Sequence, residues 1–167
     1  TVTGVQTCAL PILLAVYLDA VFFAKLDPLD FAQEGHRTEF EVIDDPESPL
    51  VYRGVVFNEM KGDMSSLRSQ AWERLQYHLF KTSTYHFNSG GDPKEIPKLT
   101  YDGLRRFYEA HYHPSNAIFM TWGRQAPEVM MDRFESLALC RFKSVDGVID
   151  ATDEPRWVKP QIGRAHV

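Results

Sequence analysis

The two ends of the chain are related to each other in a way that limits which residues can belong to a fold. Codons can be chosen for residues 6–12, QTCALPI, so that the complementary DNA strand, read one base later, encodes IGRAHV, which is residues 162–167. Two ends of a natural domain have no reason to be antisense copies, and the implied DNA resembles a common sequencing-library adapter. We therefore predict that residues 1–12 and 162–167 are adapter-derived artefacts, to be set aside like other processing scars. Residues 13–161 are then the part that folds.

Composition and charge exclude several classes of partner. Hydrophobic residues make up 44% of the chain and charged residues 25%, which is ordinary for a globular protein. The net charge of −5 argues against nucleic acid, since phosphate binding requires a basic surface, and suits attraction of basic peptides. The apolar run of residues 8–18 is too short to cross a bilayer and lacks the basic flank of a signal peptide, so we expect no membrane partner.

Cysteine content bears on the compartment. The chain has two cysteines, Cys8 and Cys140, which make no disulfide framework. We therefore expect a reducing, soluble compartment: the cytoplasm if the source is bacterial, or an organelle matrix if it is eukaryotic.

Hydrophobic periodicity predicts four helices and two short strands. The proline at 28 ends the first helix, Thr100 caps the third, and Pro127 begins the fourth. Gly62 and the Ser65-Ser66 pair weaken the middle of the second helix. The predicted helices are residues 13–26, from about 51 or 54 to 80, 101–111 and 127–139, and the predicted strands are 38–42 and 117–122.

No common catalytic motif is present. The sequence contains no H-x-x-E-H, H-E-x-x-H, C-x-x-C or G-x-S-x-G pattern. His111 and His113 form an H-x-H pair, but Pro114 follows directly, which favours a helix end over a metal site. Taken alone, Glu59 is an ordinary glutamate near a helix start. The Gly-Gly pair at 90–91 suggests only a loop whose backbone another chain can approach closely.

Four stretches in order carry a more specific signal: VYLDAVFF at 16–23, GVVFNEMKG at 54–62, SGGDPKEIP at 89–97, and HYHPSNA at 111–117 followed by Phe119. Together they resemble the presequence protease subgroup of the pitrilysin/insulysin-type (inverzincin) zinc metallopeptidases. The similarity spans nearly all of residues 13–123 and indicates an internal fragment of the first domain. It implies an α+β fold, a layered domain with an antiparallel-rich sheet covered by helices, here truncated.

The resemblance also implies a function for particular residues. In this family an H-x-x-E-H helix supplies two zinc-binding histidines and a general base, and a downstream glutamate completes the Zn2+ site. Glu59 matches that third ligand. The H-x-x-E-H helix would lie upstream of Leu13, so no catalytic residue can be assigned here, and we expect the fragment alone to be inactive. Ser89, Gly90 and Gly91 are candidates for substrate binding.

The implied partners are peptide substrates and the remainder of the parent chain. The intact parent would be a metalloendopeptidase that degrades oligopeptides, such as presequence-like or other unstructured peptides, with zinc-activated water. An alternative is a non-catalytic homologous domain that serves as a peptide-binding or scaffold subunit. An H-x-x-E-H motif upstream in the parent gene would distinguish the two. A third interpretation, an unrelated helical binding module, requires the four matches to be coincidence.

Overall fold

The computed structural model describes residues 4–147, 149 and 153–160, with side chains from Pro11 onward. The chain divides into two compact units, and each is formed by two separate segments. Unit 1 comprises Thr1–Phe31 and Leu99–Ile149, and unit 2 comprises Ala32–Lys98 and Asp150–Val167. The predicted artefact at 162–167 lies outside the described residues, as do residues 1–3 of the predicted artefact at 1–12.

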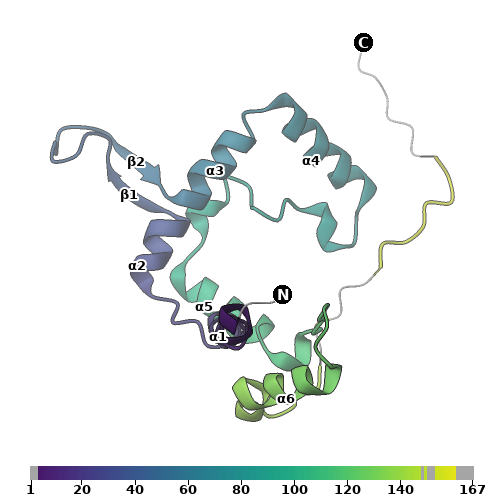
Figure 1. Ribbon diagram of the computed structural model, residues 1–167. Coiled ribbons are helices and arrows are strands. Elements are labelled where there is room, and N and C mark those ends of the chain that lie inside the picture. Colours follow the sequence, from purple (N-terminus) through teal and green to yellow (C-terminus); the bar gives the residue numbers. More distant parts are fainter. Residues whose placement is uncertain (1–3, 148, 150–152, 161–167) are drawn as a thin grey trace. The chain divides into compact units, whose positions relative to one another are not determined.

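Unit 1 is helical. Its helices are α1 (Gly4–Phe22), α2 (Pro28–Asp30), α5 (Tyr101–His111) and α6 (Pro127–Leu137), with short 3-10 turns at Pro114–Asn116 and Leu139–Arg141 (Figure 1). Leu18, Phe22 and Ala138 are buried at its centre. Partly buried apolar side chains surround them: Leu14, Val21, Phe23, Phe134 and Phe142.

Helix α1 differs from the predicted helix at both ends. It begins at Gly4, within the residues that we set aside, and ends at Phe22, four residues before the predicted end. The early end has a physical cause in α5. The Tyr108 hydroxyl donates to the Val21 carbonyl oxygen at 2.7 Å and accepts the Ala24 N–H at 3.1 Å, so it satisfies groups that a longer helix would have paired. The adapter origin of residues 1–12 stays a prediction.

Unit 2 combines a hairpin with two helices. Strands β1 (Arg37–Phe40) and β2 (Leu50–Arg53) pair antiparallel, with Arg37 opposite Arg53. Glu39 accepts from both of these arginines, at 2.8 Å and 2.9 Å, and so offsets their mutual repulsion. Helices α3 (Val55–Asp63) and α4 (Leu67–Leu79) follow, with 3-10 turns at Thr84–His86 and Ile96–Lys98. The mixture of helices and antiparallel sheet confirms the α+β class.

The predicted helix ending at residue 80 is wrong in its continuity, because the chain breaks between α3 and α4. Ser65 Oγ donates to the Gly62 carbonyl oxygen at 2.6 Å, and Gln70 Nε2 donates to the Met64 carbonyl oxygen at 2.8 Å. These side chains bond to carbonyl groups at the break, which is how serine competes with a continuous helix.

The two predicted strands have different outcomes. The strand predicted at 38–42 is present as β1, and β2 was missed because its residues were assigned to the start of a helix. The strand predicted at 117–122 is not paired with another strand among the described residues. The sheet that these residues contain consists of β1 and β2. Strand assignment requires a partner, and sequence propensity does not reveal whether one is present.

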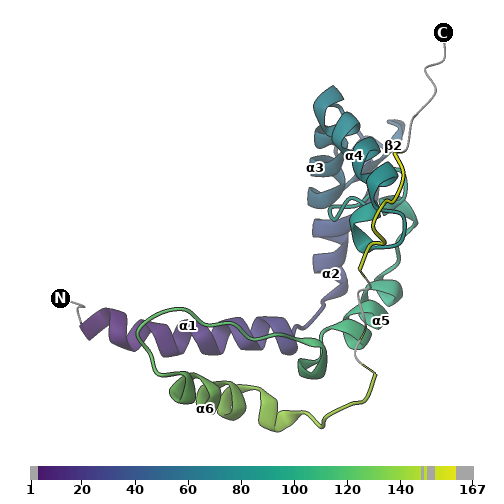
Figure 2. The same ribbon diagram turned by 90° about the vertical axis from the view of Figure 1, so that its right-hand side faces the viewer.

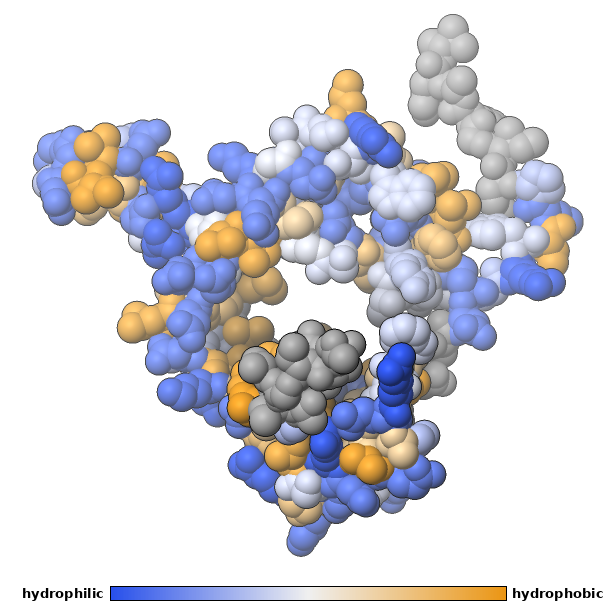
Figure 3. Space-filling view, viewed as in Figure 1, coloured by the Kyte–Doolittle hydropathy of each residue, from blue (hydrophilic) through white to orange (hydrophobic). Residues whose placement is uncertain are grey.

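Few apolar side chains are fully covered. In the part of the chain with described side chains, the buried hydrophobic residues are Leu18, Phe22, Phe57, Ile96 and Ala138. Figure 3 shows hydrophobic residues at the surface over the hairpin and over several helices. Among the described residues, no helix combines the length and apolar character needed to span a membrane.

Glu154 joins the two segments that make up unit 2. Its carboxylate accepts the N–H groups of residues 81–83 at 2.8, 2.9 and 3.0 Å, and the Thr82 hydroxyl at 3.1 Å. Partial desolvation acts to raise the pKa of Glu154, but these donors outweigh it and lower the pKa to about 2. A single carboxylate therefore joins segments more than 70 residues apart in sequence.

We expect Tyr108→Phe to destabilise unit 1, because it removes the two hydrogen bonds that join α5 to the end of α1. The free energy of unfolding should fall by about 1–2 kcal/mol. Urea titrations followed by far-UV circular dichroism would measure it. Tyr112→Phe is the matched control, since Tyr112 stacks on Tyr108 at 4.8 Å but has no hydroxyl hydrogen bond with a described residue. Equal losses in both variants would contradict the assignment.

The low pKa of Glu154 predicts an acid-dependent loss of stability. Because its pKa is depressed from 4.5 to about 2, the contact contributes fully above about pH 4.5 and is lost as the pH falls toward 2. Glu154→Gln should lower the urea midpoint at pH 7, and its difference from the unmodified chain should shrink across that window. Glu135→Gln, at an exposed position of α6, should show no such trend. A pH-independent difference for Glu154→Gln would count against the contact.

Candidate functional site

Glu59 lies on the exposed face of α3. Phe57, two residues earlier, is buried and packs edge-on against Tyr52 with ring centroids 6.1 Å apart. Two residues correspond to about 200° around a helix, so Glu59 points away from the face that Phe57 anchors. Its side chain is exposed and makes no hydrogen bond or ion pair with any residue that the structure describes. The carboxylate is therefore available to an external ligand.

Gly54 sets where α3 begins. A Cβ atom at this position would overlap the Gly35 carbonyl oxygen, and would lie 2.7 Å from the Gly35 carbonyl carbon and 2.9 Å from His36 Cα. These neighbours are backbone atoms and cannot rotate away, so only glycine permits this approach. The contact fixes the first turn of α3 and, with it, the direction of the Glu59 side chain.

The Ser89–Gly91 loop packs against the same helix. A Cβ atom at Gly90 would overlap the sulfur of Met60, the residue that follows Glu59. Gly91 has a φ of 93°, in the region that favours glycine. The Asn88 side chain accepts the Gly90 N–H at 3.0 Å and holds the turn. The structure thus brings the predicted metal ligand and the predicted substrate loop to one helix.

The described residues do not form a complete metal site. No group of three or more histidine, cysteine, aspartate or glutamate side chains among them could hold an ion. Asp63, one turn after Glu59, accepts a hydrogen bond from Ser69 Oγ at 2.8 Å. Glu59 therefore fits a metal site only as a single carboxylate ligand that other residues must complete.

The H-x-H pair lies in unit 1 and has local roles. His111 Nδ1 donates to the Phe107 carbonyl oxygen at 2.8 Å, within α5. His113 Nδ1 accepts the Ser115 N–H at 3.1 Å and caps the following turn. These contacts agree with the helix-end interpretation of both residues.

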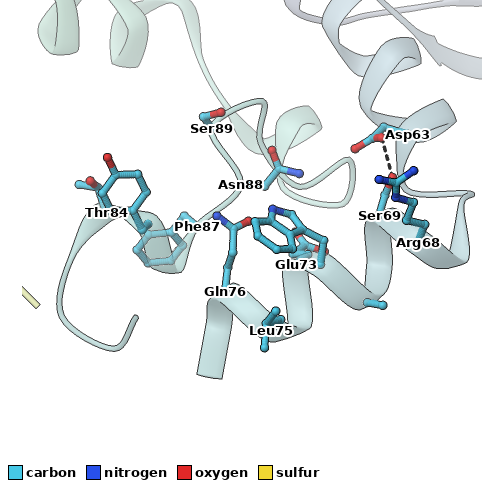
Figure 4. A pocket seen from close by; sticks show the side chains of 13 residues that line it. Asp63, Arg68, Ser69, Glu73, Leu75, Gln76, Thr84, Phe87, Asn88 and Ser89 are labelled. Atoms are coloured by element: carbon cyan, nitrogen blue, oxygen red, sulfur yellow. Dashed lines mark hydrogen bonds between the residues drawn. The ribbon is translucent and has the colours of Figure 1, made fainter. Parts of the chain in front are cut away.

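An open groove of about 1170 Å3 between α4 and the segment 84–89 was not predicted from the sequence. Figure 4 shows Glu73 and Gln76 extending from α4 toward Phe87 and Asn88 on the facing segment. The groove's walls are Asp63, Arg68, Ser69, Ala71, Trp72, Glu73, Leu75, Gln76, Thr84, Tyr85, Phe87, Asn88 and Ser89. Ser89 joins it to the predicted substrate loop. The signal in the sequence was a set of aromatic residues flanking a glycine-rich loop.

Comparisons with known proteins agree on one group of relatives. The chain is 44% identical over 149 residues to a protein from Xenopus tropicalis named mitochondrial presequence protease, a match that covers 89% of this chain and 14% of that protein. The protein of the same name from Danio rerio is 45% identical over 150 residues, covering 90% of this chain and 15% of its own length. The one from Schizosaccharomyces pombe is 50% identical over 108 residues, or 65% of this chain and 11% of its own length.

The chain therefore spans about one seventh of the first two of these relatives. No family model matches it.

The Gly54 contact can be tested with two glycine substitutions, one at the residue before α3 and one within the helix. Gly54→Ala should lower the free energy of unfolding by about 1–3 kcal/mol, because the added methyl group meets backbone atoms. Gly62→Ala is the control: no atom lies within 4 Å of its added Cβ, and alanine should stabilise this helical position by about 0.5–1 kcal/mol. Thermal unfolding of both variants would measure the difference. A neutral Gly54→Ala would contradict the close approach.

Proposed function

The chain belongs to the presequence protease family as an internal segment of its members, and on this premise we propose that it is part of a zinc metalloendopeptidase that degrades oligopeptides. The observation that carries the proposal is the arrangement on α3, where an exposed, unpaired Glu59 lies beside the position that Gly90 packs against. A rigid helix that presents one free carboxylate next to a glycine loop suits both ligand binding and substrate approach.

In this proposal Glu59 supplies one negatively charged oxygen ligand to Zn2+, and residues outside this chain supply the others. Bound zinc would lower the pKa of a water molecule and polarise the peptide carbonyl. Glu59 contributes by lowering the net charge of the site, and its helix restricts where the carboxylate can lie. Phe57 and Gly54 act through packing, since they fix the rotation of α3 without touching the metal.

The loop at 89–91 would contact the substrate through particular atoms. The Gly90 N–H is already bonded to the Asn88 side chain, and the Gly91 N–H to the Asn88 carbonyl oxygen at 3.0 Å. Both amide donors are therefore occupied. Ser89 is exposed, and its hydroxyl has no hydrogen bond with a described residue, which makes it the group best able to bond a peptide.

The proposed substrates are unstructured peptides with basic character. The net charge of −5 favours their approach at long range. The names of the relatives refer to mitochondria, and we propose the same compartment for the parent of this chain. The chain alone would have no peptidase activity, because a catalytic zinc site takes about three protein ligands and Glu59 is one.

The test is Glu59→Gln in the intact parent protein. An amide oxygen is a weaker ligand than a carboxylate, so bound zinc and cleavage of a fluorogenic peptide should fall together, by about 10- to 100-fold. Folding should be unchanged, because the exposed side chain keeps its shape. Glu135→Gln, at an exposed glutamate of α6, is the control and should leave both quantities near normal.

The result distinguishes the proposal from its alternative. Normal zinc content and turnover in Glu59→Gln would show that Glu59 is not a ligand. A parent protein that lacks zinc and activity before any substitution would indicate the non-catalytic, peptide-binding homologue.

A further inference from the structure

The groove beside α4 is lined on both sides by aromatic rings that solvent can reach. Trp72, Tyr85 and Phe87 are 61%, 66% and 72% exposed. Single exposed aromatic residues are normal, but three of them around one groove of about 1170 Å3 form a surface suited to a ligand. The faces of such rings attract cations, and the indole ring of tryptophan does so most strongly.

Glu73 gives this groove its net charge. It follows Trp72 in α4, is half-buried, and makes no hydrogen bond or ion pair with any residue that the structure describes. Figure 4 shows Arg68 beside Asp63 and Ser69 at one end of the groove. The opposite charges of Asp63 and Arg68 cancel there, so the remaining negative charge is that of Glu73. A partly desolvated carboxylate without a partner gains from a cation that can donate hydrogen bonds to it.

Neutral polar groups along the groove match those of a peptide backbone. The Gln76 amide offers a donor and an acceptor, and it has no hydrogen bond with a described residue. The Ser89 hydroxyl is equally unbonded. From Arg68 to Gln76 the helix rises about 12 Å. An extended peptide of about three or four residues has the same length.

The groove is continuous with the elements that carry the proposed site. Asp63, which lines it, is the last residue of α3, the helix that contains Glu59. Figure 2 shows that only a short turn separates α3 from α4. On the facing wall, Ser89 leads into the Gly90 loop that packs on Met60. The groove therefore borders both the helix and the loop that the proposed function assigns to zinc and substrate.

We propose that this groove is a specificity site for the substrate peptide, and that it binds a lysine or arginine side chain against Glu73 and the ring of Trp72. Glu73 would accept hydrogen bonds from the cation, while the aromatic walls cover the aliphatic stem of the same side chain. Gln76 and Ser89 would bond the peptide backbone. The inference rests on the proposed peptidase function for its role in cleavage, whereas the binding itself requires neither zinc nor activity.

Two other kinds of ligand fit less well. An uncharged apolar ligand would cover Glu73 and leave its carboxylate buried without a partner, which costs free energy. An anion would be attracted by Arg68 at one end but repelled by Asp63 and Glu73. A basic side chain is the ligand that satisfies both the carboxylate and the aromatic rings.

Two synthetic peptides test the binding to the chain. One is an acetylated and amidated pentapeptide with a central arginine between leucines, and the other has citrulline in its place, which keeps the shape and removes the charge. By calorimetry the arginine peptide should bind about 10-fold more tightly, as one charge-assisted hydrogen-bonded pair predicts. Glu73→Gln should reduce this ratio to about 2-fold, the remainder coming from the aromatic rings. Glu135→Gln, on α6, should leave the ratio unchanged.

The intact parent separates this inference from the proposed function. Glu73→Gln should lower kcat/KM for a fluorogenic arginine peptide by about 5-fold relative to its citrulline counterpart, with bound zinc unchanged. A parent that lacks zinc and cleavage but keeps the arginine preference in binding would support the groove and overturn only the peptidase. A parent with zinc and cleavage but no arginine preference would overturn the groove alone.

Four further results would also overturn the inference. Equal binding of the two peptides would show that the groove does not recognise the charge. A preference that survives Glu73→Gln would place the cation elsewhere. Tighter binding of a peptide with central glutamate would assign the groove to an anion. Binding by the isolated chain that is absent from the parent would show that the rest of the parent covers the groove.

Discussion

Two stretches of backbone meet at Gly54, and the candidate functional residues of unit 2 depend on that contact. The Gly35 carbonyl group and His36 Cα lie where any side chain at 54 would begin. The contact sets the start of α3, Phe57 then anchors one face of the helix, and Glu59 is left on the other. The Gly90 loop is positioned through Met60 on the same helix. The candidate site is therefore positioned by close packing at Gly54 and Gly90, where neither residue has a side chain.

The parts of the fold that could be predicted from sequence are those set by local chemistry. Thr100 accepts the Gly103 N–H at 3.1 Å, and α5 begins and ends at the predicted residues. Pro127 starts α6 as expected. The errors arise where contacts with residues distant in sequence determine where an element ends. Helix α1 ends early because the Tyr108 hydroxyl, 87 residues away from Val21, takes its carbonyl group. Gly62 and the serine pair indicated a weak point after α3. Whether the helix breaks there depended on the Ser65 and Gln70 side chains, which bond to carbonyl groups at the break.

The site could be predicted only in part. Glu59 has no distinguishing feature in composition or periodicity, and its candidacy came from the motif that surrounds it. The packing of the glycine loop on Met60 requires contacts across about 30 residues that no local pattern encodes. The groove beside α4 was missed because no local pattern distinguishes Trp72, Tyr85 and Phe87, which are exposed here, from the aromatic residues of a core. Exposed aromatic residues of this kind are distinguished from core only by the fold.

The division of unit 1 into two segments has a consequence for the order of folding during synthesis. Residues 32–98 of unit 2 leave the ribosome before α5 and α6 exist, so α1 must wait for its packing partners. Until Tyr108 and Ala138 emerge, Leu18 and Phe22 have no core to enter. Closing a loop of that length costs entropy that only the late contacts repay. Nascent chains at this stage expose apolar helix surface, and such exposure makes folding intermediates prone to aggregation.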